Sequence, residues 1–580
     1  TYRILRTYIM QLRDYQRETL EVLYSALQTE LNVLLSSPCG SGKTVVASIL
    51  IQTLLREIPS FRILILVDRD VLIQQFRDKL LTLAPELFMN IGIVCASTSN
   101  IKDHSRQVTI ASRQSLINRL NDCEAFQLII IDEVHMAQVP EEGKDLDQFG
   151  VIIKTFREYN PKTRLLGITA SPFRLGQGYI FGDRNAPGCT PYFPYLTHQI
   201  TIEELQRQGY LVPLIGKKAA SSELTERLSH VRMIGGEYNL GEISDIMSQG
   251  VHIDSAVEVW KKYISDRKKT LAFAITISHA DKLERAFNAA GIPAMAIHSD
   301  LDDLESYARM QALKKGEAKV FISVAKLTVG LDITDVDAIL MARPTQSPAL
   351  YLQCLGRGAR TAPGKQDCYV IDLVNNGDIH GTDLDKLKVR YKQSTRPTEA
   401  NPAGLKYCPS CETEMHPAVR VCPECGHEFE FEADTPDMAD VKYGSEPPKE
   451  VEVLAVYGER HTGKKSSLTL LKVRVEIDLG LQIKTANMWI CFEGDGYSGF
   501  AVTKGRALWE QLTYDGVPLP HDTEEALTFI KSGAFCNPAR ALVDMSGRWP
   551  EVKELIYDTP KEFVYEAKKE DKEEEMDVPF

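Results

Sequence analysis

The stretch SPCGSGKT at residues 37–44 constrains this 580-residue chain more than any other segment. It follows an apolar run at 31–35 that is typical of a buried strand, and it precedes an apolar segment at 45–50 that suits a buried helix. A strand, a glycine-rich turn and a helix are the setting of a phosphate-binding loop, although Ser37 stands where the usual pattern has Gly. Gly40 and Gly42 let backbone N–H groups close around phosphate oxygens at the positive end of the helix. Lys43 is expected to reach the β- and γ-phosphates, and Thr44 to ligate Mg²⁺.

A second motif, LIIIDEVH at residues 128–135, supplies the acids that such a loop requires. Its apolar run predicts a buried strand that ends in two adjacent carboxylates. Asp132 is expected to hold Mg²⁺ through water, and Glu133 to orient the attacking water. Together the two motifs predict that the chain binds and hydrolyses a nucleoside triphosphate.

In this order the two motifs resemble a superfamily 2 DExH helicase-type motor, and within that superfamily the RadD-type DNA-repair proteins of bacteria and phages. The narrower resemblance rests on the segment around GGEYNLGEI before the second lobe, on VIDLVNNGDIHG at 370–381, and on a β-rich region that follows a cysteine-rich segment. Alternating strand and helix patterns from residue 31 to 174 predict a doubly wound parallel sheet. The fold expected is α/β, with two RecA-like lobes, then a zinc ribbon and a small β-rich domain.

The resemblance also implies roles for individual residues. Gln16 matches the glutamine that reads the adenine edge in such motors, which makes ATP the implied nucleotide. Thr169 and Ser171 match the motif that couples hydrolysis to movement between the lobes. The implied nucleotide site comprises Arg13, Gln16, Pro38, Cys39, Gly40, Ser41, Gly42, Lys43, Thr44, Gly330, Asp332 and Gln353. The implied nucleic-acid contacts are Arg69, Gln75, Ser112, Gln114 and Thr328.

The strongest signal in the second lobe is QCLGRGAR at residues 353–360. The spacing of Arg357 and Arg360 predicts that both lie on one face of a helix. A guanidinium fork matches phosphoryl oxygens in its geometry. The resemblance implies that Arg360 is the arginine finger of the ATP site, with Arg357 and Gln353 as its partners.

Two CxxC pairs separated by ten residues lie at 408–425. Four thiolates at this spacing suit tetrahedral Zn²⁺, and a segment so poor in apolar residues needs a metal in place of a core. We therefore expect a closed, structural zinc ribbon, with His416 and His427 as bystanders. The predicted ligands are Cys408, Cys411, Cys422 and Cys425.

The carboxyl-terminal third changes to strand-like patterns at Val451, which predict a small domain of OB-like size. Its aromatic residues suit either base stacking or core packing, and Trp489, Phe492, Tyr497 and Phe500 are the candidates. The chain ends in EEEMDVPF, an acidic tip that resembles that of bacterial single-stranded-DNA-binding proteins. Such a tip either recruits proteins that read it or is a solvating tail.

The predicted domains are residues 1–174 (first lobe), 175–250 (crossing segment), 251–400 (second lobe), 401–432 (zinc ribbon), 433–450 (acidic linker), 451–558 (β-rich domain) and 559–580 (acidic tail).

The net charge of −13 does not exclude nucleic-acid binding, because a local basic patch decides such binding. The first residues carry no signal-peptide pattern and no apolar run reaches the roughly 18 residues of a membrane helix, which predicts a cytoplasmic protein, in a bacterium or in the host of a virus.

The function predicted is an ATP-dependent helicase or translocase that acts on single-stranded or branched DNA in repair, recombination or replication. Two alternatives stay open. One is an RNA-directed ATPase of the same superfamily, since DEVH does not separate RNA from DNA. The other is an ATP-gated adaptor that recruits repair proteins through its zinc ribbon and acidic tail.

Overall fold

The computed structural model describes residues 12–68, 70–95, 103–183, 185–219, 224, 227–228, 230–234, 236–324, 333–389, 406–407, 414–415, 438–444, 449–462, 469–479, 482–495, 499–545 and 550–558. The chain divides into two compact units, one that ends at residue 444 and one that begins at residue 445. None of the described helices is both long and apolar enough to cross a membrane.

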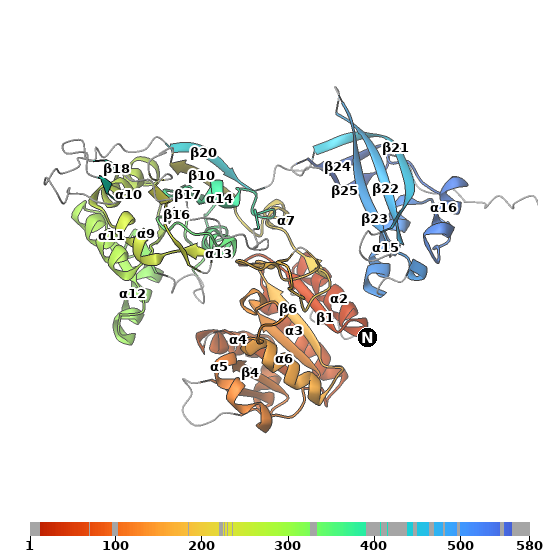
Figure 1. Cartoon of the computed structure of the whole chain (residues 1–580), viewed down its shortest axis with the longest axis horizontal. Coiled ribbons are helices and arrows are strands. Elements are labelled where there is room, and N and C mark those ends of the chain that lie inside the picture. Colours follow the sequence, from red (N-terminus) through yellow and green to blue (C-terminus); the bar gives the residue numbers. More distant parts are fainter. Residues whose placement is uncertain are drawn as a thin grey trace, which may run out of the picture. The chain divides into compact units, whose positions relative to one another are not determined.

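The first lobe is built on a seven-stranded sheet in the order β3-β4-β2-β5-β6-β1-β9, in which every described pairing is parallel. Figure 1 draws this lobe in red to orange, with β1, β4 and β6 of the sheet labelled. All five residues of β2 are buried, as expected for an apolar strand covered on both faces. The strands are β1 (Asn32–Ser36), β2 (Ile63–Val67), β3 (Ile91–Val94), β4 (Val108–Ser112), β5 (Leu128–Asp132), β6 (Arg164–Thr169) and β9 (His198–Gln199), with β7 (Phe173–Arg174) and β8 (Gly178–Tyr179) forming a separate hairpin. The helices are α2 (Asp14–Thr29), α3 (Lys43–Glu57), α4 (Asp70–Leu83), α5 (Arg113–Leu116) and α6 (Gln148–Tyr159), with 3₁₀ turns η1 (Pro85–Asn90), η2 (Ile117–Asp122) and η3 (Val134–Met136).

The second lobe has its own seven-stranded sheet in the order β14-β15-β13-β16-β17-β10-β20. Its pairings are parallel except for β20, which runs antiparallel to β10. The strands are β10 (Leu214–Ala219), β13 (Thr270–Phe273), β14 (Ala294–Ile297), β15 (Val320–Ser323), β16 (Ala338–Met341), β17 (Cys368–Asp372) and β20 (Met438–Tyr443), and β11 (Met233–Ile234) pairs with β12 (Glu237–Tyr238). The helices are α7 (Ile202–Arg207), α9 (Leu240–Met247), α10 (Gly250–Tyr263), α11 (Ile277–Ala289), α12 (Asp303–Lys315), α13 (Pro348–Gly358) and α14 (Asn376–His380). Two parallel sheets of this kind confirm the α/β fold with two RecA-like lobes.

The segment boundaries differ from those expected from the sequence. Strand β9 still pairs with the first sheet, and β10 already belongs to the second, although both fall in the predicted crossing segment 175–250. Strand β20 lies within the predicted acidic linker 433–450 but pairs with β10 over six residues. The sequences LIGKKA and MADVKY have no regular apolar period that would predict a strand, and the pairing that makes them strands comes from residues far away in the chain.

The carboxyl-terminal unit is a closed barrel in the order β21-β22-β23-β25-β24. Its strands are β21 (Lys449–Thr462), β22 (Thr469–Asp478), β23 (Ile483–Ile490), β24 (Arg540–Asp544) and β25 (Glu551–Ile556). Closure comes from β24, which pairs antiparallel with both β21 and β25, while β23 meets β25 in parallel. This connectivity is that of an OB-fold. The helices α15 (Gly499–Leu512) and α16 (Thr523–Lys531) and the 3₁₀ turn η4 (Glu493–Asp495) lie between β23 and β24 in the chain.

Candidate nucleotide site

The phosphate-binding loop has the backbone that the motif predicts. It joins β1 to α3, and Gly40 and Gly42 have φ angles of 88° and 83°, in the left-handed region that favours glycine. Helix α3 begins at Lys43, so the lysine and Thr44 occupy its first turn, where free backbone N–H groups point toward an anion. The loop is therefore shaped for a phosphate chain.

Ser37, which replaces the usual glycine, is part of the loop's own hydrogen-bond network. Its backbone N–H donates to the Thr169 carbonyl over 2.8 Å, and its Oγ lies 2.5 Å from Ser41 Oγ. Ser41 Oγ also donates to the Pro38 carbonyl over 2.8 Å. These contacts fix the loop to β6 and explain how it keeps its shape without the first glycine.

The two predicted acids follow β5 and lie beside the loop lysine. Lys43 Nζ is 3.3 Å from Glu133 Oε1, and Glu133 itself has a left-handed backbone with φ of 52°. Burial raises the pKa of Asp132, and the neighbouring Glu133 carboxylate adds to that rise. Burial opposes ionisation of Glu133 and Lys43 too, but their mutual attraction outweighs it, so the pKa of Glu133 is lowered and the pKa of Lys43 is raised. The loop lysine and the predicted water-orienting acid are thus a charged pair.

A pocket of about 290 Å³ opens beside the loop, and Arg13 and Gln16 are among the residues that line it. Gln16 is held in place because its Nε2 donates to the Ser41 carbonyl over 3.0 Å and its Oε1 accepts from Arg13 N over 3.2 Å. The sequence analysis did not single out Lys79 and Leu83, two pocket residues that come from α4. It also missed Tyr15, whose hydroxyl donates to the Ser41 carbonyl over 2.6 Å.

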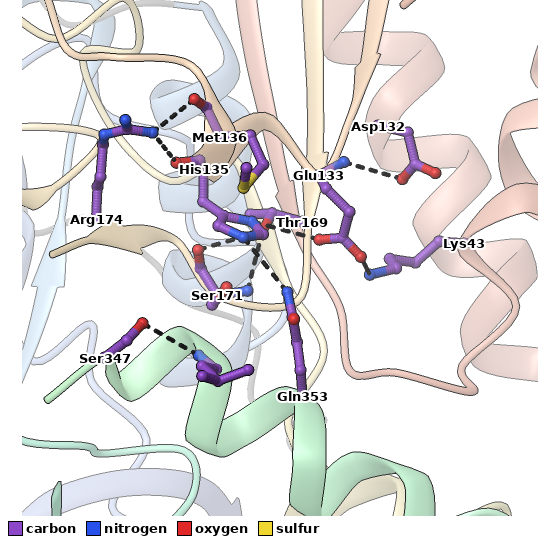
Figure 2. Close-up of polar contacts among 11 residues, drawn as sticks. Lys43, Asp132, Glu133, His135, Met136, Thr169, Ser171, Arg174, Ser347 and Gln353 are labelled. Carbon is purple, nitrogen blue, oxygen red and sulfur yellow. Dashed lines mark hydrogen bonds and ion pairs between the residues drawn. The ribbon is translucent and has the colours of Figure 1, made fainter. Parts of the chain in front are cut away.

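Thr169 and Ser171, the predicted coupling residues, form a hydrogen-bonded chain with His135 of the DEVH motif (Figure 2). His135 Nδ1 lies 2.9 Å from Thr169 Oγ1, which accepts from Ser171 N over 3.0 Å and donates to the Ser171 carbonyl over 3.2 Å. On the other side of the ring, Gln353 Nε2 of α13 lies 3.4 Å from His135 Nε2. One proton arrangement satisfies all four contacts, with the imidazole proton on Nδ1 and the Gln353 amide donating to Nε2. The chain links the acid motif of the first lobe to α13 of the second.

The predicted arginines also meet the loop. A Cβ on Gly40 would lie 3.1 Å from Arg360 Cγ, and a Cβ on Gly356 would lie 3.0 Å from Cys39 Cβ, so the end of α13 packs closely on the loop. Arg357 is buried, and burial together with the charge of Arg360 lowers its pKa. The expectation of one shared helical face is wrong, since α13 ends at Gly358 and Arg360 instead forms a β-bridge with Leu211.

The predicted nucleic-acid residues that are described differ in their exposure. Ser112 is buried at the end of β4 and its Oγ donates to Ser115 Oγ over 3.1 Å, whereas Gln75 and Gln114 are exposed. A pair that the sequence analysis did not single out lies nearby, with Arg113 Nε 3.0 Å from Asp68 Oδ1. The remaining predicted contact and nucleotide residues lie outside the described residues: Arg69, Thr328, Gly330 and Asp332.

The four cysteines of the predicted zinc ribbon, Tyr497 and the acidic tip also lie outside the described residues. Among the residues that are described, no group of three or more His, Cys, Asp or Glu side chains is arranged to hold a metal. The described residues beside the first CxxC pair are β18 (Lys406–Tyr407) and β19 (Glu414–Met415), which pair antiparallel.

Comparison with known families matches both lobes. Residues 9–174 match the family described as "Type III restriction enzyme, res subunit", and residues 255–362 match "Helicase conserved C-terminal domain". The chain carries the two motor domains of a superfamily 2 helicase. In these motor domains, the phosphate loop and DEVH belong to the first match and the paired arginines to the second.

Among curated proteins, the chain is 28% identical over 378 residues to "Putative ATP-dependent helicase IRC3" of Saccharomyces cerevisiae, covering 63% of this chain and 52% of that protein. It is 26% identical over 408 residues to a 51.5 kDa protein of a Lactococcus phage, covering 69% and 78%. The chain therefore spans about half the length of the yeast protein that it matches. Among solved structures, a fragment of an HsdR subunit of a type I restriction enzyme from Vibrio vulnificus aligns with a TM-score of 0.47 at 19% identity, covering 64% of this chain and 66% of that one.

Proposed function

We propose that this chain is an ATP-driven motor that moves along DNA, binding ATP with Mg²⁺ between its two lobes. The observation that carries the proposal is the contact between the arginine-bearing end of α13 and the phosphate loop. An arginine from one lobe that reaches the phosphates held by the other makes hydrolysis depend on how the lobes meet. ATP binding and hydrolysis would then drive movement of one lobe relative to the other.

The residues at the loop fit the two groups that the proposal requires. The pocket beside Gln16 has room for a base, and Lys43 lies at the start of α3, where phosphates are held. The hydroxyl of Thr44 and the carboxylate of Asp132 are oxygen donors of the kind that Mg²⁺ prefers. When bound, Mg²⁺ neutralises charge on the β- and γ-phosphate oxygens. Glu133 would orient the attacking water once phosphate competes for Lys43, and Arg360 with Arg357 would stabilise the departing γ-phosphate.

DNA as the substrate is supported by the names of the relatives, which include endonuclease subunits of type I restriction enzymes as well as helicases. The predicted contacts Gln75 and Gln114 are exposed, as a binding surface requires. The narrower resemblance to RadD-type proteins favours single-stranded or branched repair, recombination or replication intermediates as substrates, and a cytoplasmic location.

The decisive experiment measures ATP hydrolysis by the wild type and by Lys43→Ala with no nucleic acid, single-stranded DNA, forked DNA or RNA. We expect DNA to stimulate hydrolysis, with forks at least as effective as single strands, and Lys43→Ala to abolish it. Stimulation by RNA alone would move the proposal to an RNA-directed ATPase. A Glu133→Gln chain that hydrolyses no ATP yet keeps full biological activity would favour the adaptor.

Zinc binding by Cys408, Cys411, Cys422 and Cys425 belongs to the same proposal. The antiparallel pairing of β18 with β19 brings together the residues that precede and follow the first CxxC pair, which supports this proposal. Metal analysis of the purified chain should find about one zinc per chain, and Cys408→Ser should lower it. The acidic tip is proposed to recruit replication or repair proteins, and unchanged pull-downs after removal of residues 573–580 would argue against that role.

A further inference from the structure

We propose that the outer face of strands β21, β22 and β23 of the carboxyl-terminal barrel binds single-stranded nucleic acid. This binding would be separate from the activity of the motor and would require no ATP. It begins with the alternation along β22, where Leu471, Val473 and Val475 are buried in the barrel. Lys472 and Arg474 must therefore point outward. The strand register places Lys472 between Glu459 and Trp489, and places Arg474 between Tyr457 and Asn487.

Two large aromatic side chains on this face are exposed to an extent that core packing does not explain. Tyr457 is 50% exposed and Trp489 is 45% exposed, whereas Phe492 and Trp509 of the same unit are 2% and 1% exposed. Phe492, a stacking candidate in the sequence, is therefore a core residue. Trp489 is held upright by His461, whose ring centroid lies 5.0 Å away at 67°, and by Lys472 Nζ at 5.8 Å. Trp489 is therefore a partly exposed aromatic surface beside a cation.

The separation of the two platforms suits a strand of several bases. Tyr457 and Trp489 lie on strands two apart in the sheet, and their partners on β22, Arg474 and Lys472, are two residues apart along it. Strand spacings put them roughly 12 Å apart, too far to sandwich one ring but suited to stack two bases of one strand. Stacking on exposed aromatics beside cations is how sequence-tolerant proteins bind single strands.

The cations of the face are held by a single acid. Lys472 Nζ lies 2.5 Å from Glu459 Oε1, and Arg474 Nη1 lies 3.6 Å from Glu459 Oε2. Both cations sit on the rim of the Trp489 and Tyr457 platforms, where the phosphates of a stacked strand would run. Glu459 thus occupies the place of a phosphate, and a bound strand would compete with it for the two cations. Further along β22, Glu476 and Asp478 on the same side limit the binding face to the end of the sheet that carries Trp489.

The test measures binding of fluorescently labelled oligo(dT) and oligo(U) to the full chain without nucleotide, together with quenching of intrinsic tryptophan fluorescence. Trp489→Ala should weaken binding by about tenfold and remove most of the quenching, because stacking is the main sequence-independent contribution. Glu459→Gln should tighten binding at low salt and steepen its dependence on log[salt] by ~0.7, the effect of one further phosphate contact. Comparing oligo(dT) with oligo(U) shows which sugar the face prefers.

Leu519→Ala is the matched control, an exposed apolar side chain elsewhere in the same unit, 38% exposed, that should leave binding unchanged. If both affinity and quenching survive Trp489→Ala and Tyr457→Ala, the face does not bind single strands and the inference is overturned. An unaltered salt dependence in Glu459→Gln would overturn the role of that acid. ATP hydrolysis without nucleic acid should be the same in all four variants, so a failure here is distinct from a failure of the motor proposal.

Discussion

At the level of single residues, the loop requires glycine at position 42 for two separate reasons. Its φ of 83° strains any other residue, and a Cβ there would lie 2.5 Å from Gln16 Nε2. Gly42→Ala should therefore cost about 1 kcal/mol of stability through backbone strain and, in addition, displace the residue predicted to read adenine. We expect at least tenfold weaker binding of a fluorescent ATP analogue.

Gly143→Ala is the control for that prediction. Gly143 has a φ of 76°, but nothing described lies within 4 Å of where its Cβ would be. The substitution should lose a similar amount of stability in thermal melts while ATP binding stays unchanged. Equal loss of ATP binding in both variants would show that strain alone, and not Gln16, explains the effect.

Gln353 tests the link between the lobes. Its amide Nε2 lies 3.4 Å from His135 Nε2, so Gln353→Ala should break the chain that runs to Thr169 and Ser171. We expect nucleic-acid-stimulated ATP hydrolysis to fall about tenfold, a loss typical of one misplaced catalytic contact. Affinity for ATP should change little, because Gln353 does not line the base pocket. Loss of ATP affinity with an unchanged stimulated rate would contradict a coupling role.

At the level of elements, the junction of β13 with α11 predicts a pH dependence. His279 is buried, and its Nδ1 accepts from Ile275 N over 3.3 Å, which requires the neutral ring. Burial lowers its pKa from 6.5 to about 4, so the unfolded chain takes up the proton first as pH falls. The second lobe should lose on the order of 3 kcal/mol of stability between pH 6.5 and 4 from this residue alone.

His279→Gln can keep the acceptor without titrating, so it should flatten that part of the stability profile. Hydrogen exchange of the β13 amides, measured across the pH range, reports the second lobe separately from the rest of the chain. Identical pH profiles in the wild type and the variant would contradict the assignment.

The edge strand β20 gives a second prediction at this scale. A Cβ on Gly216 of β10 would collide with the ring of Tyr443 of β20, which is buried. Gly216→Ala should cost roughly 1–3 kcal/mol by overpacking and release β20 from the sheet. Limited proteolysis should then cut residues 438–444 faster than in the wild type. Gly250→Ala, where nothing described lies within 4 Å, should not change the rate, and no change in Gly216→Ala would mean that β20 is not docked in solution.

These elements also show how far the sequence could predict the structure. The apolar runs of β2 and β5 predict buried strands directly, and the two short motifs identify the phosphate loop and its acids. Strands β10 and β20 were not predicted, because their sequences have no regular period and they become strands through pairing between residues more than two hundred positions apart. Arg360 was assigned to a helix because spacing does not reveal where α13 ends. Trp489 was a stacking candidate in the sequence, but its grouping with Glu459 and Lys472 was not predicted, since the register of three strands brings them together.

At the level of the whole molecule, the division at residues 444 and 445 separates the motor from the barrel. Each unit has its own buried core, with Leu355 and Phe321 in the first and Trp509 and Val473 in the second. Because a unit with its own core can fold alone, a chain that ends at residue 444 should keep its ATP hydrolysis. The fragment 445–558 should in turn melt cooperatively by circular dichroism.

The truncated motor separates two kinds of contribution to DNA binding. If the barrel provides a second DNA-binding face, DNA bound at one face is held at a high effective concentration near the other face. Removing the barrel abolishes this gain. The DNA concentration for half-maximal stimulation of ATP hydrolysis should then rise about tenfold or more, while the rate at saturating DNA stays the same. Trp489→Ala in the full chain should reproduce most of that rise. If truncation raises the required DNA concentration but Trp489→Ala does not, the barrel contributes through a surface other than the Trp489 face. If neither change has an effect, DNA binding belongs to the two lobes alone.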